Sequence, residues 1–272
     1  MVWRAWGAGS PLLLLHGASG SWTHWIRNIP GLAAQHRVLV PDMPGFGESD
    51  ALPAPHTVEA LAEAVARGLD IVAPSSLDIA GFSLGGIVAG HVAARLGRRI
   101  ATLVLFGPGG LGLPTQSTRP LSPITAEMTP ADVERAHREN LKILMLAHAD
   151  RVDDLAVRLQ IDNVGRARFK SGDIPSPDAL VRALPAVTAR VVAVFSTRDA
   201  FVGSSLGERH RVLSALRPDL DFRTLEGLGH WAIYEAPAEA NGMLLDALSR
   251  GKSRPSAPRS AGSAPAGDGG RS

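Results

Sequence analysis

The sequence predicts an α/β fold, with a mostly parallel central sheet, helices on both faces of that sheet and an inserted helical lid. Two observations predict it. Short apolar runs of strand length alternate with longer segments of helical period. The alternation breaks once, between about residues 110 and 186, where a charged helical stretch stands in place of a strand. Because parallel strands need a crossover, which is usually a helix, the alternation indicates a parallel sheet covered on both faces.

Five runs are expected to form the central strands, since each is short, apolar and bounded by glycine, proline or charged residues. They are residues 11–15, 37–41, 77–81, 102–107 and 190–196, with the run VWRAW as a candidate strand ahead of them. The expected helices are residues 25–34, 57–72, 84–96 and 236–248.

The chain is expected to divide into a core, a lid and a tail. With 272 residues and 45% hydrophobic side chains, it is long enough for one substantial core. Residues 1–110 and 187–250 form the expected core, and residues 111–186 form a helical lid over the edge of the sheet. Residues 251–272 are rich in Ser, Ala, Gly, Pro and Arg, so we expect a disordered tail.

Composition narrows the function classes. The 28 Lys and Arg residues nearly balance 26 Asp and Glu residues, so no nucleic-acid partner is expected. The absence of cysteine excludes disulfides and thiolate nucleophiles. The start of the chain lacks the pattern of a signal peptide and no run is long enough to span a bilayer, so we expect a soluble, cytoplasmic protein without a membrane partner. The oligomeric state is left open, and a homo-oligomer is compatible with the sequence.

A serine stands at the junction of an expected strand and an expected helix. In IAGFSLGG, the pattern is Gly81-x-Ser83-x-Gly85. Glycine on both sides lets the strand and helix approach closely, while Ser83 is forced to a positive φ that lifts its Oγ clear of the sheet. The helix N-terminus then offers the Leu84 N–H to an oxyanion. The pentapeptide alone is common, but at this junction it indicates a nucleophile.

A serine nucleophile needs a base, and His230 is the best candidate. It follows Gly227 and Gly229 in a loop near the end of the chain, and loops commonly carry catalytic side chains. The other histidines are weaker candidates, because four are expected on helices (His91, His137, His148, His210) and three lack a glycine loop (His24, His36, His56).

The base in turn needs a carboxylate to orient it, and Asp199 is expected to provide it. Asp199 follows the run 190–196, so it lies at the carboxyl end of a parallel strand, where the sites of such sheets collect. Asp219 and Asp221 are rivals, but they precede a strand, and we expect them to be solvated turn residues.

With Ser83, Asp199 and His230 in this order on an alternating chain, the sequence resembles the α/β-hydrolase family from about residue 9 to 248. LLLLHGASGSW looks like the family's His-Gly loop, in which Ala18 would supply the second oxyanion N–H beside Leu84. VPDMPGFGESD is similar to a structural segment of the family, so Asp42, Gly45 and Gly47 are expected to set a turn. The resemblance implies that His16 shapes its loop by bonding to the backbone.

Within that family, GHWAIYEAPAEAN is most similar to meta-cleavage product hydrolases, which split carbon–carbon bonds in ring-fission products of aromatic degradation. The resemblance implies substrate contacts from Trp231 and from a lid arginine, for which Arg166 is the candidate and Arg168 its neighbour. Phe82 and Met145 are also expected to contact the substrate. Those relatives commonly have Asn where this chain has Phe82, so an ester, lactone or thioester substrate stays open.

The expected reaction is acyl transfer to water on a small carbonyl substrate, by attack of Ser83 with His230 as base. The rival hypothesis is a non-catalytic small-molecule binding protein on the same fold. No cofactor is expected, since the glycine-rich passage Gly107–Gly112 is followed by prolines that forbid the helix a dinucleotide needs. No metal is expected either, because the sequence has no His-Glu-x-x-His motif and no tight His/Asp cluster.

Overall fold

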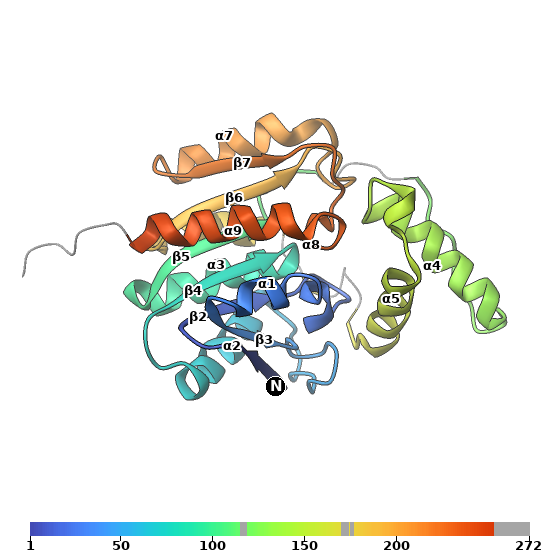
Figure 1. The fold of residues 1–272 in the computed structure, drawn as a ribbon, viewed down its shortest axis with the longest axis horizontal. Coiled ribbons are helices and arrows are strands. Elements are labelled where there is room, and N and C mark those ends of the chain that lie inside the picture. Colours follow the sequence, from blue (N-terminus) through green and yellow to red (C-terminus); the bar gives the residue numbers. More distant parts are fainter. Residues whose placement is uncertain (115–118, 170–173, 175–176, 253–272) are drawn as a thin grey trace, which may run out of the picture.

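The computed structural model describes residues 1–114, 119–169, 174 and 177–252. Seven strands form one sheet in the order β1-β3-β2-β4-β5-β6-β7 (Figure 1). The strands are β1 (Trp3–Trp6), β2 (Ser10–Leu15), β3 (His36–Pro41), β4 (Leu77–Phe82), β5 (Ile100–Phe106), β6 (Arg190–Ser196) and β7 (Asp221–Leu225). Only β1, at the edge, is antiparallel to its neighbour, which confirms the predicted mostly parallel sheet.

The strand order places two loops side by side at the carboxyl edge of the sheet. The chain passes from β2 outward to β3 and then returns to β4 on the other side of β2. Leu15 at the end of β2 pairs with Gly81 near the end of β4. Ligands of open parallel sheets bind where the strand order reverses in this way, so the loops after β2 and β4 are positioned for a site.

Helices cover both faces of the sheet, as predicted. On β2, Leu13 and Leu15 belong to one apolar cluster, together with side chains of α2 (Val58–Val72) and α3 (Leu84–Leu96). Leu12 and Leu14 belong to the other cluster, together with side chains of α1 (Ile29–Ala33) and α9 (Pro237–Lys252). The alternation follows from the two-residue period of a strand, and each face of β2 buries two leucines.

A helical insertion separates β5 from β6. It comprises α4 (Pro130–Leu144), η3 (Ala149–Arg151), α5 (Asp154–Arg166), α6 (Ala179–Ala183) and η4 (Leu184–Ala186). In Figure 1, α4 and α5 lie together beyond one end of the sheet. The sequence predicted one long helical stretch here, but it splits because α4 ends at Leu144 and the Asp153 side chain caps a new helix by accepting from the Ala156 N–H.

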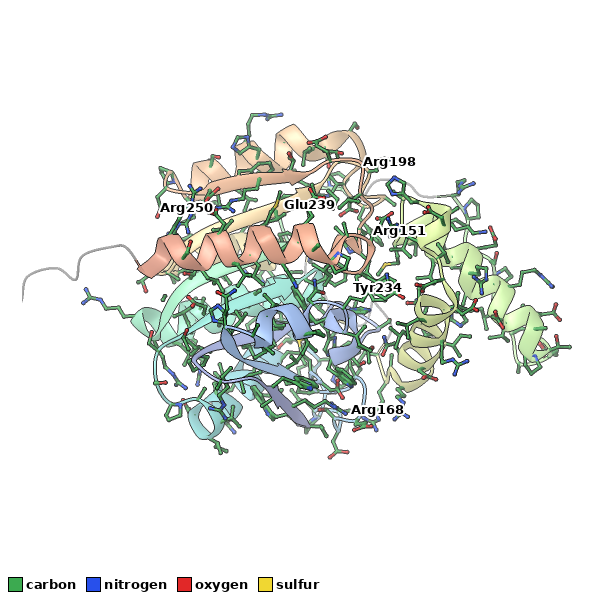
Figure 2. All side chains as sticks on the ribbon, in the orientation of Figure 1. Arg151, Arg168, Arg198, Tyr234, Glu239 and Arg250 are labelled. Carbon is green, nitrogen blue, oxygen red and sulfur yellow. The ribbon has the colours of Figure 1, made fainter. Side chains whose placement is uncertain are left out.

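Polar contacts tie the insertion to the core. The Arg27 guanidinium pairs with Asp153, and the Tyr234 hydroxyl donates to the same carboxylate over 2.6 Å. Burial and the Asp153 carboxylate raise the pKa of Tyr234. The Asn163 amide donates to the Thr23 hydroxyl over 3.0 Å. Figure 2 shows Tyr234 on the side of the core that faces the insertion.

Some element boundaries differ from the prediction. The expected helix at 25–34 is a short η1 (Trp22–Trp25) followed by α1, because Pro30 lies in the first turn of a new helix. The last helix, α9, runs to Lys252, two residues beyond the expected end of the core, and residues 253–272 of the expected tail lie outside the described residues. Across the described ranges, no helix is both long and apolar enough to cross a membrane.

The other described helices are η2 (Gly97–Arg99), η5 (Gly203–Ser205), α7 (Leu206–Leu216) and α8 (Ala232–Glu235). Of these, η5 and α7 follow β6, and α8 follows the loop after β7. The turns at the starts of η5 and α8 therefore belong to the same edge of the sheet as the loops after β2 and β4.

Candidate active site

Ser83 lies in a strained turn between β4 and α3. Its φ is +53° and its ψ is −118°, and among the described non-glycine residues only Ser19 also has a positive φ. Glycine is required on both sides. A Cβ on Gly81 would lie 2.3 Å from the Gly85 carbonyl oxygen, and a Cβ on Gly85 would lie 2.4 Å from the carbonyl oxygens of Leu15 and His16. The predicted turn geometry is therefore present.

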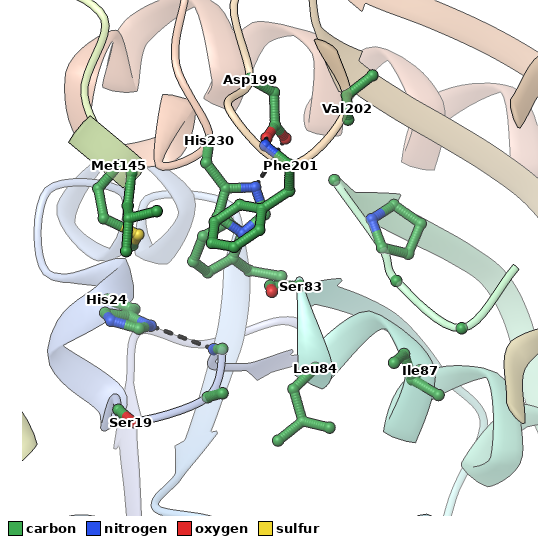
Figure 3. A pocket seen from close by; sticks show the side chains of 18 of the residues that line it. Ser19, His24, Ser83, Leu84, Ile87, Met145, Asp199, Phe201, Val202 and His230 are labelled. Atoms are coloured by element: carbon green, nitrogen blue, oxygen red, sulfur yellow. Dashed lines mark hydrogen bonds and ion pairs between the residues drawn. The ribbon is translucent and has the colours of Figure 1, made fainter. Parts of the chain in front are cut away.

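Asp199 and His230 meet at the ends of β6 and β7. The His230 Nδ1–H donates to Asp199 Oδ2 over 2.7 Å, and Asp199 Oδ1 accepts from the Phe201 N–H over 2.8 Å. Both side chains are buried. In Figure 3 the His230 ring lies between Asp199 and Ser83, so its other nitrogen is left for the serine side. The structure thus brings the three residues together, and their catalytic roles stay predictions.

The rival carboxylates have other partners. Asp219 pairs with Arg217, and Asp221 pairs with Arg190 and Arg223. The expectation of a solvated turn is wrong for Asp221, which begins β7 and is only partly exposed, because the two arginines hold it against the sheet.

The three residues line one cavity of about 720 Å³ between the core and the insertion. Volumes of this size accommodate small organic ligands. From the core, the lining includes Ala18, Phe82, Leu84, Ile87, Leu111 and Phe201. From the insertion it includes Leu121, Ile124, Leu144, Met145, Gln160 and Val164. The wall is therefore mainly apolar, and Ser83 and His230 are among its polar residues.

Both predicted oxyanion donors border this cavity. Leu84 is the first residue of α3, so its N–H has no partner within the helix. Ala18 follows Gly17, and a Cβ on Gly17 would lie only 3.3 Å from the Ser83 Cβ, which shows how closely that loop passes the serine. The Gly17 N–H is occupied by the His24 Nδ1 at 3.1 Å. Ala18, in the loop after β2, and Leu84, at the start of α3, thus border the same cavity as Ser83, and their function as oxyanion donors stays a prediction.

His16 lies behind this loop and bonds to backbone on both sides. The Met43 N–H donates to its Nε2 over 2.9 Å, so the proton is on Nδ1, which donates to the Gly17 carbonyl over 2.8 Å. Burial lowers the pKa of His16 below its usual value of 6.5 and keeps the ring neutral. This arrangement matches the expected loop-shaping function.

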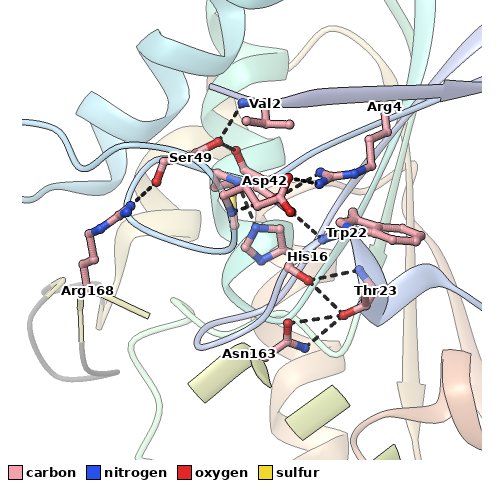
Figure 4. Close-up of polar contacts among 12 residues, drawn as sticks. Val2, Arg4, His16, Trp22, Thr23, Asp42, Ser49, Asn163 and Arg168 are labelled. Atoms are coloured by element: carbon pink, nitrogen blue, oxygen red, sulfur yellow. Dashed lines mark hydrogen bonds and ion pairs between the residues drawn. The ribbon is translucent and has the colours of Figure 1, made fainter. Parts of the chain in front are cut away.

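Asp42 organises the turn after β3, as expected. Its carboxylate accepts from the Trp22 N–H over 2.8 Å and from the Glu48 N–H over 3.0 Å, and pairs with Arg4 (Figure 4). Gly47 has a φ of +52°, and a Cβ there would lie 2.4 Å from the Asp42 carboxyl carbon. The turn therefore depends on a glycine that leaves room for the carboxylate.

Of the predicted substrate residues, Phe82 and Met145 line the cavity, but Trp231 does not. Trp231 is fully buried behind His24, where its Nε1–H donates to the His24 carbonyl over 3.0 Å and its ring stacks on Tyr234. The expected substrate contact is corrected, because the indole points into the core and anchors the turn next to His230.

The expected contact from Arg166 is also corrected. Gln160 and Val164, one turn apart on α5, line the cavity. Arg166 lies about 200° around the helix from Val164 and is exposed. Arg168 braces a core loop instead. Its N–H donates to the Gly45 carbonyl over 2.9 Å. Its guanidinium donates to the Ser49 carbonyl (Figure 4).

Among the polar residues that line the cavity and that the sequence did not single out for the site, three are buried and titratable, namely His24, His137 and Arg209. All three are buried, and burial lowers the pKa of each. His24 lies outside any glycine loop of its own, yet its ring packs on Gly20 and accepts from Gly17. The available signal was a histidine seven residues after Gly17, in the same loop after the first leucine run.

The loop that carries His230 is clamped against the insertion. The buried Glu235 accepts from the Gly229 N–H over 2.7 Å and from both the N–H and the Nδ1–H of His148 over 2.8 Å. The Trp231 N–H donates to the Met145 carbonyl over 2.7 Å. The prediction that His148 lies on a helix is wrong, because α4 ends at Leu144 and His148 belongs to this clamp.

The residues that the structure describes include no group of three His, Cys, Asp or Glu side chains that could hold a metal ion. The glycine-rich passage after β5 contains Gly107, Gly110 and Gly112 at positive φ. In the described parts of the passage from residue 107 to residue 129, no helix follows these glycines. The passage leads from the sheet into the insertion.

The chain belongs to the α/β hydrolase fold family, which matches residues 10–188. It is 27% identical over 263 residues to a 2-hydroxy-6-oxo-6-phenylhexa-2,4-dienoate hydrolase of Burkholderia cepacia, covering 90% of both chains. The resemblance predicted from the sequence is thereby confirmed.

Two solved structures share the fold. An esterase of Rhodococcus sp. ECU1013 superposes with a TM-score of 0.74 at 24% identity, covering 91% of this chain and 94% of that chain. A meta-cleavage product hydrolase of Pseudomonas fluorescens IP01 superposes with a TM-score of 0.69 at 21% identity, covering 91% of this chain and 93% of that chain.

Proposed function

We propose that this chain is a serine hydrolase with Ser83 as nucleophile, His230 as general base and Asp199 as the carboxylate that orients it. One observation carries the proposal. A serine held at a positive φ on a helix N-terminus lines the same cavity as a buried His–Asp pair with a 2.7 Å hydrogen bond. A strained serine is costly to keep, and strain of this kind clusters at functional sites.

In the proposed mechanism, Ser83 Oγ attacks a carbonyl carbon while His230 Nε2 takes its proton. The Asp199 carboxylate fixes the proton on Nδ1 and stabilises the imidazolium. The N–H groups of Ala18 and Leu84 hold the developing oxyanion, and the dipole of α3 adds to them. His230 then protonates the leaving group, and water releases the acyl group from Ser83.

We propose a small carbonyl substrate, cleaved either at a carbon–carbon bond of a 2-hydroxy-6-oxo-dienoate or at a carboxylic ester. The cavity volume and its apolar wall suit a molecule of this size. The names of the relatives support both options, since they include a dienoate hydrolase and an esterase. Residues 111–186 act as the lid in this proposal, because side chains of α4 and α5 line the same cavity as Ser83.

The test is covalent labelling. A fluorophosphonate probe should modify Ser83, located by mass spectrometry, and S83A should be unlabelled. S19A is the matched control, since Ser19 also has a positive φ and lines the cavity. It should label as the wild type does. Labelling at another residue, or none, would contradict the proposal.

A substrate panel then separates the two bond types. The panel compares p-nitrophenyl esters with a 2-hydroxy-6-oxo-dienoate. Turnover of either should fall in S83A and H230A by about 10⁴-fold or more. If neither substrate is turned over although Ser83 is labelled, the substrate class is wrong and the nucleophile stands.

A further inference from the structure

Arg209 is a buried cation on the wall of the cavity that the proposed mechanism does not use. It lies on α7, is only 5% exposed, and borders the cavity together with Asp199 and Val202. Arg166, the arginine expected to bind substrate, is exposed on the insertion. Arg209 comes from the core instead.

Its hydrogen-bond partners are neutral. The Nε–H donates to Ser205 Oγ over 3.1 Å and an Nη2–H donates to the Phe201 carbonyl over 3.0 Å. These bonds fix the plane of the guanidinium, because Ser205 Oγ is itself tied to the Val202 carbonyl at 2.6 Å. Nη1 forms no hydrogen bond to any of the described residues. It is not one of their fully buried N or O atoms that lack a hydrogen-bond partner, so it keeps some exposed surface. Its N–H groups remain accessible.

Nearby Asp199 does not pair with Arg209. One oxygen of Asp199 accepts from His230 and the other from the Phe201 N–H. No ion pair joins Arg209 to any carboxylate in the described part of the chain. Burial lowers the pKa of Arg209, while the charges of Asp199 and Glu208 oppose that shift. A buried guanidinium without an anionic partner is costly, and a bound anion would offset that cost.

We propose that Arg209 is the anion-binding residue of this cavity and that the substrate carries a carboxylate, held by Nη1. The inference depends on the proposed function for the reaction that the bound substrate undergoes. The binding of a carboxylate by Arg209 does not depend on it. A planar guanidinium matches a carboxylate, and a hydrogen bond to a charged group contributes enough to change affinity about tenfold to hundredfold. The competing explanation is that Arg209 only braces the 199–205 turn, in which case anionic and neutral substrates would be affected equally.

The kinetic test uses matched pairs of esters in R209Q, R209K and wild type. One pair is p-nitrophenyl hydrogen glutarate against p-nitrophenyl pentanoate, and the other is 4-acetoxybenzoate against 4-acetoxybenzamide, which moves the carboxylate to the leaving group. In at least one pair, wild-type kcat/KM should favour the anion, and R209Q should lose about tenfold or more on that anion alone. R209K, which keeps the charge without the fork, should lose less. R166Q is the matched control and should behave as the wild type.

A binding test separates this inference from the proposed function. Glutarate and benzoate binding, measured by calorimetry, should be at least tenfold weaker in R209Q than in wild type or R166Q. Circular dichroism checks that each variant is folded, and R209K serves if R209Q is not. Equal loss on both members of each pair, or wild-type protein that binds neither carboxylate, would overturn the inference. Loss of binding in R209Q without any Ser83 labelling would leave it standing while the proposed function fails.

Discussion

His24 is held in a single protonation state by its neighbours. The Gly17 N–H can only donate, so the Nδ1 that accepts it carries no proton, and the neutral ring has its proton on Nε2. Burial lowers the pKa of His24 well below 6.5. The ring therefore stays neutral at assay pH and keeps the His16–Gly17 peptide in one orientation.

We expect H24L to lose about tenfold to hundredfold in kcat with a smaller change in KM, because an unpaired buried N–H costs about 1–3 kcal/mol and frees the oxyanion loop. H24N should recover most of this loss, since its amide oxygen can accept from Gly17. Steady-state ester kinetics measure both variants. If H24N and H24L were equally impaired at unchanged melting temperature, the hydrogen bond would not be the cause.

The same residue predicts part of the pH dependence of stability. In the unfolded chain His24 binds a proton below about pH 6.5, whereas in the folded protein it stays neutral to lower pH. The unfolded state then binds more protons, so the free energy of unfolding falls as the pH drops below 6.5. In urea titrations, H24N should fall less steeply than wild type, by up to about 1.4 kcal/mol per pH unit. Parallel curves for the two proteins would contradict this.

At the residue scale, the sequence predicted what depends on local pattern. The positions of Ser83 and Asp199 in the fold were predicted, because a glycine-flanked turn and a strand end are visible in the chain. Arg166 and Trp231 were misplaced, because the direction of a side chain depends on the rotation of a helix and on packing against other segments. Arg209 carried no local signal, since its burial depends on how α7 packs beside the 199–205 turn.

At the element scale, the β4–α3 turn depends on backbone contacts that only glycine permits. A Cβ on Gly85 would lie 2.4 Å from the carbonyl oxygens of Leu15 and His16, which cannot move without shifting the loop after β2. We expect G85A to lose activity by about 10²-fold or more and to destabilise the fold by about 1–3 kcal/mol. Urea unfolding and ester turnover measure the two effects.

G242A is the matched control for that variant. Gly242 lies in α9, and a Cβ at this position would point into open space, so alanine there should raise stability by up to about 1 kcal/mol and leave activity unchanged. A G85A protein with wild-type turnover would show that the turn tolerates a side chain and is not required for the chemistry.

Helix prediction succeeded where the helical hydrophobic pattern extended over many residues and a capping or turn residue marked the ends. Helix α3 was predicted with its observed bounds. Helix α2 begins at Val58, one residue after the predicted start, because Thr57 is its N-cap. The insertion was less predictable, because both α4 and α5 are amphipathic and the break between them depends on the Asp153 cap and on contacts with the core. Local period does not reveal such tertiary contacts.

At the scale of the whole molecule, the site is closed by contacts between the insertion and the loop that carries His230. Strand order was not predictable from the alternation, yet it is what places Gly17 beside Ser83. Glu235 is central to the closure, since one buried carboxylate accepts from Gly229 in the core and from His148 in the insertion. The two parts therefore share one hydrogen-bonding group.

We expect E235Q to loosen this junction, because an amide NH₂ would face an N–H donor and leave it unpaired, at a cost of about 1–3 kcal/mol. Hydrogen–deuterium exchange should become faster in residues 145–152 and 227–231 but not in α2, and kcat should fall as His230 loses its fixed position. D154N is the control, since the Asp154–Arg138 pair is exposed and contributes little. Equal exchange in E235Q and D154N would mean that the insertion is held by its apolar contacts alone, and that His230 is positioned by Asp199 without help from Glu235.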